Sequence, residues 1–260
     1  RAGDSDSAEL TSNARWMMAH RPKQAAAAAA AAAAAQAPKS KGGTPAAAAG
    51  QPQPLSTSVW DFRPDVFGSH WQREGAGGRA PYALMAEAFA TMEGTTTRTL
   101  ILGSLTNAFR CLIANDAASL LPAIYLCIDR IRPSYDADAH PVSVGHSILG
   151  RALQEATGCP PRQLREKASA LGDLGDAAMA VRSSQQTLSF AKGRRKPLLI
   201  DGAVREEGDG EIGLFTALHA IAAARGTGAQ ERKRAVISRL LVAARGTETK
   251  YVVRTLEGKL

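Results

Sequence analysis

The chain has 260 residues, of which 45% are hydrophobic, 22% charged and only 5% aromatic, so it can form one sizeable hydrophobic core or two small ones. Lys and Arg number 32 against 24 Asp and Glu, and the resulting net charge of +8 favours a polyanionic partner. Its three cysteines form no C-x-x-C pair, which excludes a zinc ribbon and a small disulfide-bonded scaffold and indicates a reducing compartment. No apolar stretch reaches the roughly 18 to 20 residues that cross a membrane, so we expect a soluble protein without a membrane partner.

Residues 1–58 have the composition of a low-complexity tail, rich in Ala, Pro, Gln, Ser, Lys and Gly. Large apolar side chains are too few there to offset the conformational entropy of the chain, which predicts a disordered tether. The run Ala25–Ala35 favours transient helix but has no face that could dock specifically. Because the sequence starts at Arg1 and not at Met, we expect the natural N-terminus to lie upstream. Whether that upstream part holds a targeting or partner-binding peptide is left open.

Aromatic residues return at positions 60, 62, 67 and 71, and a glycine-rich stretch follows at Gly75–Gly78. We interpret residues 59–80 as an extended lead-in to a domain that covers residues 81–260. In that domain apolar residues recur at helical spacing, for example from Leu100 to Leu112. Alternation with a period of two is scarce, which predicts an all-α domain of about 180 residues.

Local chemistry predicts two helix starts inside the domain. Asp173 can cap a helix over residues 174–181. Thr227 and Gln230 have the spacing of a capping box before a helix over residues 236–244.

The ends of the domain carry similar signals. Pro81 suits a first helical turn, and Thr247 precedes a last helix through Leu256. Only residues 197–204, between a basic cluster and an acidic run, resemble strands, and we interpret them as a hairpin-like excursion or loop.

No constellation of catalytic or metal-binding residues is recognisable. The five histidines show no H-x-x-x-H or H-E-x-x-H spacing, so a metal site on a helix has no ligands to use. The stretch Gly145–Gly150 superficially suggests a nucleophile elbow, but it has one residue too many, and a helix that begins near Ser147 explains it better. No G-x-x-x-x-G-K-[ST] loop is present, so no nucleotide phosphate site is expected.

Two glycine-containing turns open predicted helices, at Gly172–Gly175 and at Gly226–Gly228. A helix N-terminus presents unpaired N–H groups and a partial positive charge, and glycine lets a phosphate approach the backbone closely. Two such ends on one surface would clamp a nucleic-acid backbone; alternatively, the turns only punctuate helices, and the arginines near them are a solvated face. The arginines opposite the apolar arc of the second helix are Arg232, Arg234, Arg239 and Arg245.

The order of segments along the domain carries more information than any one of them. The segments are Pro81–Leu84 with Phe89, Leu105–Arg110, Leu120–Leu126, Leu149–Gly158, the Gly172–Gly175 turn with Arg182–Gln185, the Gly226 turn and Arg254–Leu260. Over roughly Trp71 to Leu260 this series resembles the N-terminal DNA-binding domain of eukaryotic and archaeal ATP-dependent DNA ligases, most of all the DNA ligase I type.

The resemblance implies a pseudo-twofold array of helices that packs on the minor groove of nicked double-stranded DNA and binds without reading sequence. The whole enzyme would use ATP and Mg²⁺ to join 3′-hydroxyl and 5′-phosphate ends through a lysyl-AMP, in DNA replication, repair and recombination. A nuclear location is expected, with an organellar form left open. With two arginines of the basic arc added, the predicted DNA-binding residues are Arg98, Asn107, Arg110, Gly172, Asp173, Leu174, Gly175, Gly226, Thr227, Gly228, Arg232, Arg234, Gly258 and Lys259.

The sequence also departs from the family pattern. The family's nucleophilic lysine lies in a K-x-D-G motif downstream of Leu260, and the near-match at Asp201-Gly202 has Leu199 where the lysine would be. We therefore expect this part to bind DNA but to carry no catalytic residue and to bind neither ATP nor Mg²⁺. The tail lacks a clamp-binding motif, so a sliding clamp is an expected partner only through a peptide upstream. Residues 192–211 replace the family's polar loop, which leaves open whether they touch DNA.

A function of another class fits the same composition, namely a non-catalytic helical scaffold that docks proteins through its basic face. The chain has no internal repeat of 34 or 40 residues, which counts against stacked helix pairs. An in-frame K-x-D-G after Leu260 would decide for the ligase.

Overall fold

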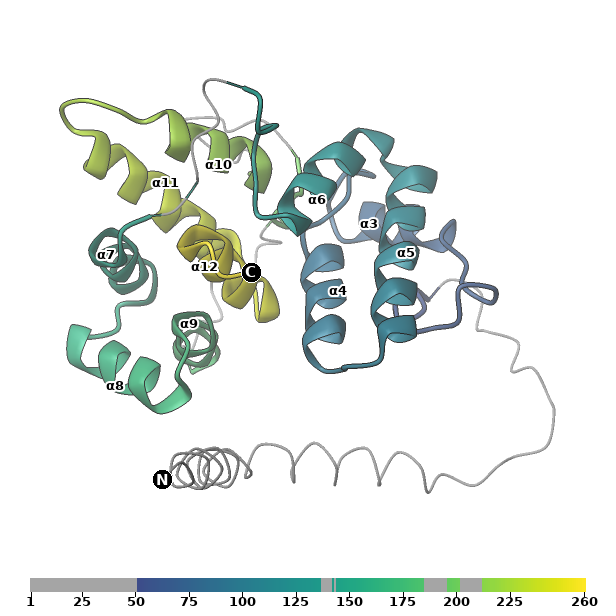
Figure 1. Cartoon of the computed structure of the whole chain (residues 1–260), viewed down its shortest axis with the longest axis horizontal. Helices are drawn as coiled ribbons and strands as arrows, with labels where there is room; N and C mark the ends of the chain where they lie inside the picture. Colours follow the sequence, from purple (N-terminus) through teal and green to yellow (C-terminus); the bar gives the residue numbers. More distant parts are fainter. Residues whose placement is uncertain (1–50, 137–141, 143, 185–195, 202–211) are drawn as a thin grey trace, which may run out of the picture. The chain divides into compact units, whose positions relative to one another are not determined.

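The computed structural model describes residues 51–136, 142, 144–184, 196–201 and 212–260 (Figure 1). They belong to one compact unit, Ala47–Leu260. The described residues form α-helices, one short 3-10 helix and two isolated β-bridges, so the all-α prediction is confirmed. Most of the predicted tail lies outside the described residues, and its disorder stays a prediction.

Two groups of helices follow one another along the chain. The first comprises α3 (Val66–Arg73), α4 (Ala83–Glu93), α5 (Arg98–Asn115), the 3-10 helix η1 (Ala117–Ser119) and α6 (Leu120–Cys127). The second comprises α7 (His146–Thr157), α8 (Pro161–Leu171), α9 (Leu174–Ser183), α10 (Leu214–Ala223), α11 (Ala229–Ala243) and α12 (Thr247–Glu257). Figure 1 shows α12 between the groups, and it packs against α9 of its own group and α4 of the other. Within the described part of the chain, no helix has the length and apolar character needed to cross a bilayer.

The predicted lead-in is more ordered than an extended segment. It contains α3, and the strap before it, residues 51–65, contributes Leu55 and Phe62 to the same core as Phe67 and Trp71 of α3. Because Phe67 and Trp71 are four residues apart, a helix places both rings on one face, where they pack edge to face with centroids 6.2 Å apart. The expectation of an extended lead-in is therefore corrected, and the strap and α3 both belong to the helical domain.

Helix α5 holds the strap through polar side chains that donate to its backbone carbonyls. The fully buried amide of Asn107 donates to two strap carbonyls, at 3.0 and 2.8 Å. Arg110 donates to two more, at 2.5 and 3.4 Å, and Asn115 to another, at 2.9 Å. The strap has no regular secondary structure that would pair these carbonyls, so these three side chains hold it against α5 and keep Leu55 and Phe62 in the core.

The apolar triplet Leu198–Ile200 was expected to lie in a hairpin-like excursion or loop, yet all three side chains are fully buried. Leu199 forms isolated bridges with Pro81 and Gly213, and backbone hydrogen bonds of 2.7 to 3.0 Å run to both neighbouring segments. The segment therefore joins the start of α4 to the start of α10. Residues 197–201 form no regular helix or strand, as the loop interpretation expects, but Leu199 bridges two other segments instead of forming a hairpin. Residues 202–204 lie outside the described part.

Three predicted helix starts are confirmed. Asp173 is the N-cap of α9, and its carboxylate accepts a hydrogen bond from the Asp176 N–H at 3.0 Å. Helix α7 begins at His146, one residue before the predicted position, and α12 begins at Thr247. Of the three, only α9 has a side-chain N-cap, since the N-cap residues of α7 and α12 are Gly145 and Gly246, and Thr247 is the first residue of its helix and not the cap.

Candidate nucleic-acid interface

Basic charge is concentrated in the second helical group. Residues 212–260 hold nine Lys and Arg against three Glu and no Asp, which amounts to six of the eight net positive charges. Residues 51–136, the strap and the first group, hold seven Lys and Arg against eight Asp and Glu. A polyanion should therefore be sought on α10–α12 and their neighbours rather than on α3–α6.

The turn between α10 and α11 leaves the start of α11 without a side-chain cap among the described residues. Gly226 and Gly228 have φ of +76° and +75°, and Gly228 is the N-cap, so the capping box predicted at Thr227 and Gln230 is wrong. The exposed Arg232 braces the turn by donating to two of its carbonyls, at 3.1 and 2.7 Å. Because Arg232 binds the carbonyls, the turn offers an anion mainly the N–H groups at the start of α11.

Arg234 lies differently from the free phosphate contact expected of it. Its side chain is 28% exposed, its Nε lies 3.2 Å from Oε1 of Glu155 on α7, and its Nη2 pairs with Glu231. Glu155 also accepts from the Ser238 hydroxyl at 3.0 Å. Arg234 therefore links α11 to α7, and much of its charge is already balanced within the domain.

The turn between α8 and α9 combines an exposed glycine with a buried one. Gly172 ends α8 with φ of +75° and is exposed, whereas Leu174 and Gly175 are buried. A Cβ on Gly175 would lie 2.8 Å from the backbone oxygen of Lys250 and 3.1 Å from Cγ of Arg254. Gly175 thus permits α9 and α12 to pack closely, a role other than the approach of a phosphate.

A network of charged side chains joins α4, α9 and α12. Lys250 Nζ lies 2.9 Å from Glu93 Oε2 and 2.6 Å from Asp176 Oδ1. Arg254 Nε lies 2.9 Å from Asp173 Oδ2, and its other nitrogens lie 3.3 Å from Glu93 and 3.4 Å from Asp176. Two cations therefore face three carboxylates, two at the start of α9 and one at the end of α4.

The network keeps its members charged. Burial raises the pKa of Glu93, but hydrogen bonds from Lys250 and Tyr251 outweigh it, and the pKa is lower than usual. Burial also raises the pKa of Asp173, but hydrogen bonds from Arg254 and from backbone N–H groups, with the charge of Arg254, together lower it by more, so the pKa of Asp173 is below its usual value. For Lys250, burial lowers the pKa, and hydrogen bonds to Asp176 and Glu93 raise it above its usual value. All of these groups are ionised at neutral pH.

The end of α12 lies beside the start of α7. The Val144 N–H donates to Leu256 O at 2.8 Å, and His146 Nδ1 lies 3.0 Å from Oε1 of Glu257. Gly258 ends α12 with φ of +68°, and the side chain of Lys259 is 64% exposed. Helix α12 thus connects two of the predicted sites. Its Arg254 contacts the start of α9, and Gly258 and Lys259 follow about one turn later.

Other predicted residues lie apart from that cluster. In Figure 1 the α10–α11 turn is at the upper left and the α8–α9 turn at the bottom, with α7 between them, so the two glycine turns do not adjoin. Arg98 is exposed at the start of α5 in the first group. Asn107 is fully buried, and Arg110 is bonded to strap carbonyls, so both serve the fold rather than an open surface.

Sequence reasoning missed Lys250 and Glu93 and named Arg254 only within a family segment, because network partners lie up to 161 positions apart and no local pattern joins them. Arg182 was quoted only as part of a family segment. Its guanidinium donates to carbonyls at the C-terminal ends of α7 and α11, at distances from 2.6 to 3.4 Å. Across the described ranges, no group of three His, Cys, Asp or Glu side chains is arranged to hold a metal ion.

Comparison with known proteins adds a family to this geometry. The family model described as DNA ligase N terminus matches residues 81–260. DNA ligase 1 of Dictyostelium discoideum is 32% identical over 202 residues, covering 78% of this chain and 15% of that protein. DNA ligase 1 of Saccharomyces cerevisiae is 32% identical over 180 residues, covering 69% and 22%. The DNA ligase of Pyrobaculum arsenaticum is 30% identical over 177 residues, covering 68% and 28%.

The matched part thus spans less than a third of the length of these relatives. The family model covers more than half of the chain, from the residue before the N-cap of α4 to the last residue. The matched range includes both glycine turns, the charged network and the basic residues 212–260. The chain belongs to the family of DNA ligase N-terminal domains.

Proposed function

We propose that this domain binds nicked duplex DNA on behalf of an ATP-dependent DNA ligase, through phosphate and minor-groove contacts. The observation that carries the proposal is the excess of nine Lys and Arg over three Glu in residues 212–260, next to an α11 start that no described side chain caps. The relatives are named DNA ligases, which fits a nucleic-acid partner for this charge. Contacts to the backbone do not read sequence, as a protein that acts at any nick requires.

Phosphates would meet the second helical group at two places. At the α10–α11 turn, the first N–H groups of α11 would bind an anion, with Arg232 holding the turn in the open conformation. At the end of α12, the exposed Lys259 would add a charge beside the α7 start, which no described side chain caps. The Lys250 and Arg254 pairs would keep the carboxylates at the α9 start from repelling the duplex.

The whole protein would join 3′-hydroxyl and 5′-phosphate ends with ATP and Mg²⁺, through a lysine of a K-x-D-G motif outside this sequence. Leu199 stands at the lysine position of the near-match and is fully buried, and Asp201 accepts from the Thr216 hydroxyl at 3.1 Å. This domain would therefore contribute binding and no catalytic lysine. Replication, repair and recombination of nuclear DNA, and a sliding clamp bound through an upstream peptide, complete the proposal.

The test is fluorescence anisotropy of a labelled nicked duplex against salt concentration. We expect binding to nicked duplexes of unrelated sequence with similar affinity, falling steeply between low and moderate salt because phosphate contacts release counterions. Incubation with labelled ATP and Mg²⁺ should leave the protein without covalent AMP. Binding that ignores salt, or no binding at any salt, would overturn the proposal in favour of a protein-docking scaffold.

A further inference from the structure

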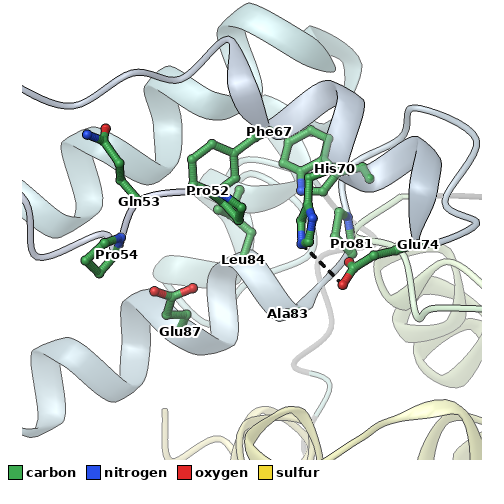
Figure 2. A pocket seen from close by; sticks show the side chains of 11 residues that line it. Pro52, Gln53, Pro54, Phe67, His70, Glu74, Pro81, Ala83, Leu84 and Glu87 are labelled. Atoms are coloured by element: carbon green, nitrogen blue, oxygen red, sulfur yellow. Dashed lines mark ion pairs between the residues drawn. The ribbon is translucent and has the colours of Figure 1, made fainter. Parts of the chain in front are cut away.

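A cavity lies in the first helical group, lined by residues of the strap, α3 and the first turns of α4. Its volume is about 390 Å³, and it lies between the strap and the first turns of α4, with one face of α3 along its side (Figure 2). Its apolar lining comprises Pro52, Pro54, Phe67, Trp71, Pro81, Ala83 and Leu84. Pockets that bind small ligands have volumes of about 300 to 1,000 Å³, so this one can hold a large side chain and part of its neighbour.

Two of the four polar side chains that line this cavity are carboxylates, and the other two are His70 and Gln53. Figure 2 shows Glu87 of α4 and Glu74, the C-cap of α3, at opposite sides of the cavity, and both are exposed residues. His70 Nε2 lies 3.2 Å from Oε1 of Glu74, and Oε1 of Glu87 accepts from the Leu55 N–H at 3.4 Å. An apolar lining between two carboxylates suits a side chain with an apolar stem and a positive end.

The surrounding charge argues against a phosphate in this cavity. Residues 51–136 hold one more acidic than basic residue, although the whole chain carries +8. A phosphate at the cavity would meet two carboxylates, whereas a guanidinium or ammonium would meet favourable charge. The ligand of this cavity is therefore cationic, unlike the proposed ligand of α10–α12.

We infer that the cavity between the strap, α3 and α4 binds a basic side chain, Arg or Lys, together with an adjoining apolar residue, from a partner protein. The strap makes this site possible because Asn107, Arg110 and Asn115 of α5 fix the segment that forms one wall. Binding there leaves the basic face of the second group free. The inference does not depend on the proposed function, because no DNA takes part in it.

The test uses the full chain labelled with ¹⁵N and the dipeptide probe acetyl-Leu-Arg-amide. Trp71 lines the cavity, and its indole N–H resonance reports binding, whereas Trp60 is 94% exposed and serves as an internal reference. We expect a saturable shift of the Trp71 resonance and no saturable shift of the Trp60 resonance. Acetyl-Leu-norleucine-amide, which lacks the charge, should bind about threefold to fivefold more weakly, as one exposed ion pair predicts.

Variants assign the binding to the rim. Glu74→Gln and Glu87→Gln should each weaken binding of the Arg probe by about threefold, and the double variant by about tenfold. Glu166→Gln on α8 is the matched control, because its side chain is 61% exposed and lies outside the cavity lining, and it should leave the affinity unchanged. All three residues are exposed, so the variants should remain folded, which the dispersion of the spectra checks.

Three results would overturn the inference. Equal affinity for the Arg and norleucine probes would make the cavity a mere apolar hollow. The same loss of affinity in Glu166→Gln as in Glu87→Gln would reduce the effect to overall charge. A Trp71 resonance that never saturates would show that nothing binds there.

Discussion

The two helical groups differ in how charge is used. In the first group, polar side chains of α5 donate hydrogen bonds to carbonyls of the strap, which has no regular secondary structure. The net charge of this group is close to zero. In the second group, helices start at glycine turns, and basic residues outnumber acidic ones three to one over residues 212–260. The net charge of +8 therefore conceals two regions of different charge, one strongly basic and one close to neutral.

The boundary between the groups depends on α12. It carries Lys250 and Arg254 toward Glu93 of α4, and Glu248 toward the α4 start. Any change at these residues therefore tests whether the groups act as one folded unit or separately.

The largest expected effect is on stability and concerns Glu248. The residue is 6% exposed, burial raises its pKa from 4.5 to about 7, and backbone hydrogen bonds from Arg245 and Ala83 offset burial only in part. Because the pKa of Glu248 is higher in the folded than in the unfolded state, this residue's contribution to stability is fully present below pH 4.5 and is lost as the pH rises to about 7. The loss should be about 3 kcal/mol in the free energy of unfolding, measured by urea denaturation across this range.

Glu248→Gln is the control for that pH dependence. Its amide oxygen can still accept from the Arg245 N–H, where the native carboxylate accepts at 2.6 Å, but it does not titrate. The variant should lack the fall seen in the wild type over this window. An identical profile in both proteins would mean that Glu248 is ionised at no cost.

The next largest effect is on stability and compares two helical glycines of the second group. One is required by close packing, and the other only adds backbone freedom to the unfolded chain. Gly175→Ala places a Cβ 2.8 Å from the Lys250 backbone oxygen, which should cost about 1 to 3 kcal/mol by pushing α9 from α12. Gly150→Ala is the control, because Gly150 is helical and no described atom beyond its chain neighbours and its own helix backbone would lie within 4 Å of the new Cβ, so the variant should stabilise by about 0.5 to 1 kcal/mol. Urea denaturation measures both, and equal effects would contradict the packing role.

Elements that depend on nearby residues could be predicted from the sequence, and elements that depend on distant segments could not. The Asp173 cap follows from residues within one turn, and both it and the start of α12 were predictable. Helix α3 was missed because its Phe67 and Trp71 are buried by helices further along the chain. Burial of Leu198–Ile200 likewise depends on segments near residues 81 and 213, which no local pattern connects.

The candidate site divides in the same way. Glycine turns and a basic segment are visible in the sequence, but whether an arginine is free depends on its neighbours in space. Arg232 and Arg234 have the same local signature, yet Arg232 donates to carbonyls of its own turn, whereas Arg234 pairs with Glu155 of another helix. Asn107 matches a family segment, and only the fold reveals that its amide is taken up by the strap.

A smaller effect, on DNA affinity, is expected from the network. Arg254→Met leaves Glu93, Asp173 and Asp176 with Lys250 alone, so negative charge at the α9 start should weaken nicked-duplex binding by about threefold to tenfold. Adding Asp176→Asn should restore part of the affinity, because it removes one unbalanced charge. Anisotropy gives the affinities, and circular dichroism checks that both variants are folded. Unchanged affinity in a folded Arg254→Met would make the network structural only.

The smallest effect compares two basic residues of the second group by the salt dependence of DNA binding. Lys259 has a side chain 64% exposed and only a distant contact, 3.6 Å, with Glu257. If it meets a phosphate, Lys259→Ala should reduce the slope of log affinity against log salt by about one. Arg234 already pairs with Glu155 and Glu231, so Arg234→Ala should leave the slope nearly unchanged. The reverse order of slopes would mean that Arg234 leaves its carboxylates for DNA, and that phosphates bind nearer to α7 and α11 than to the end of α12.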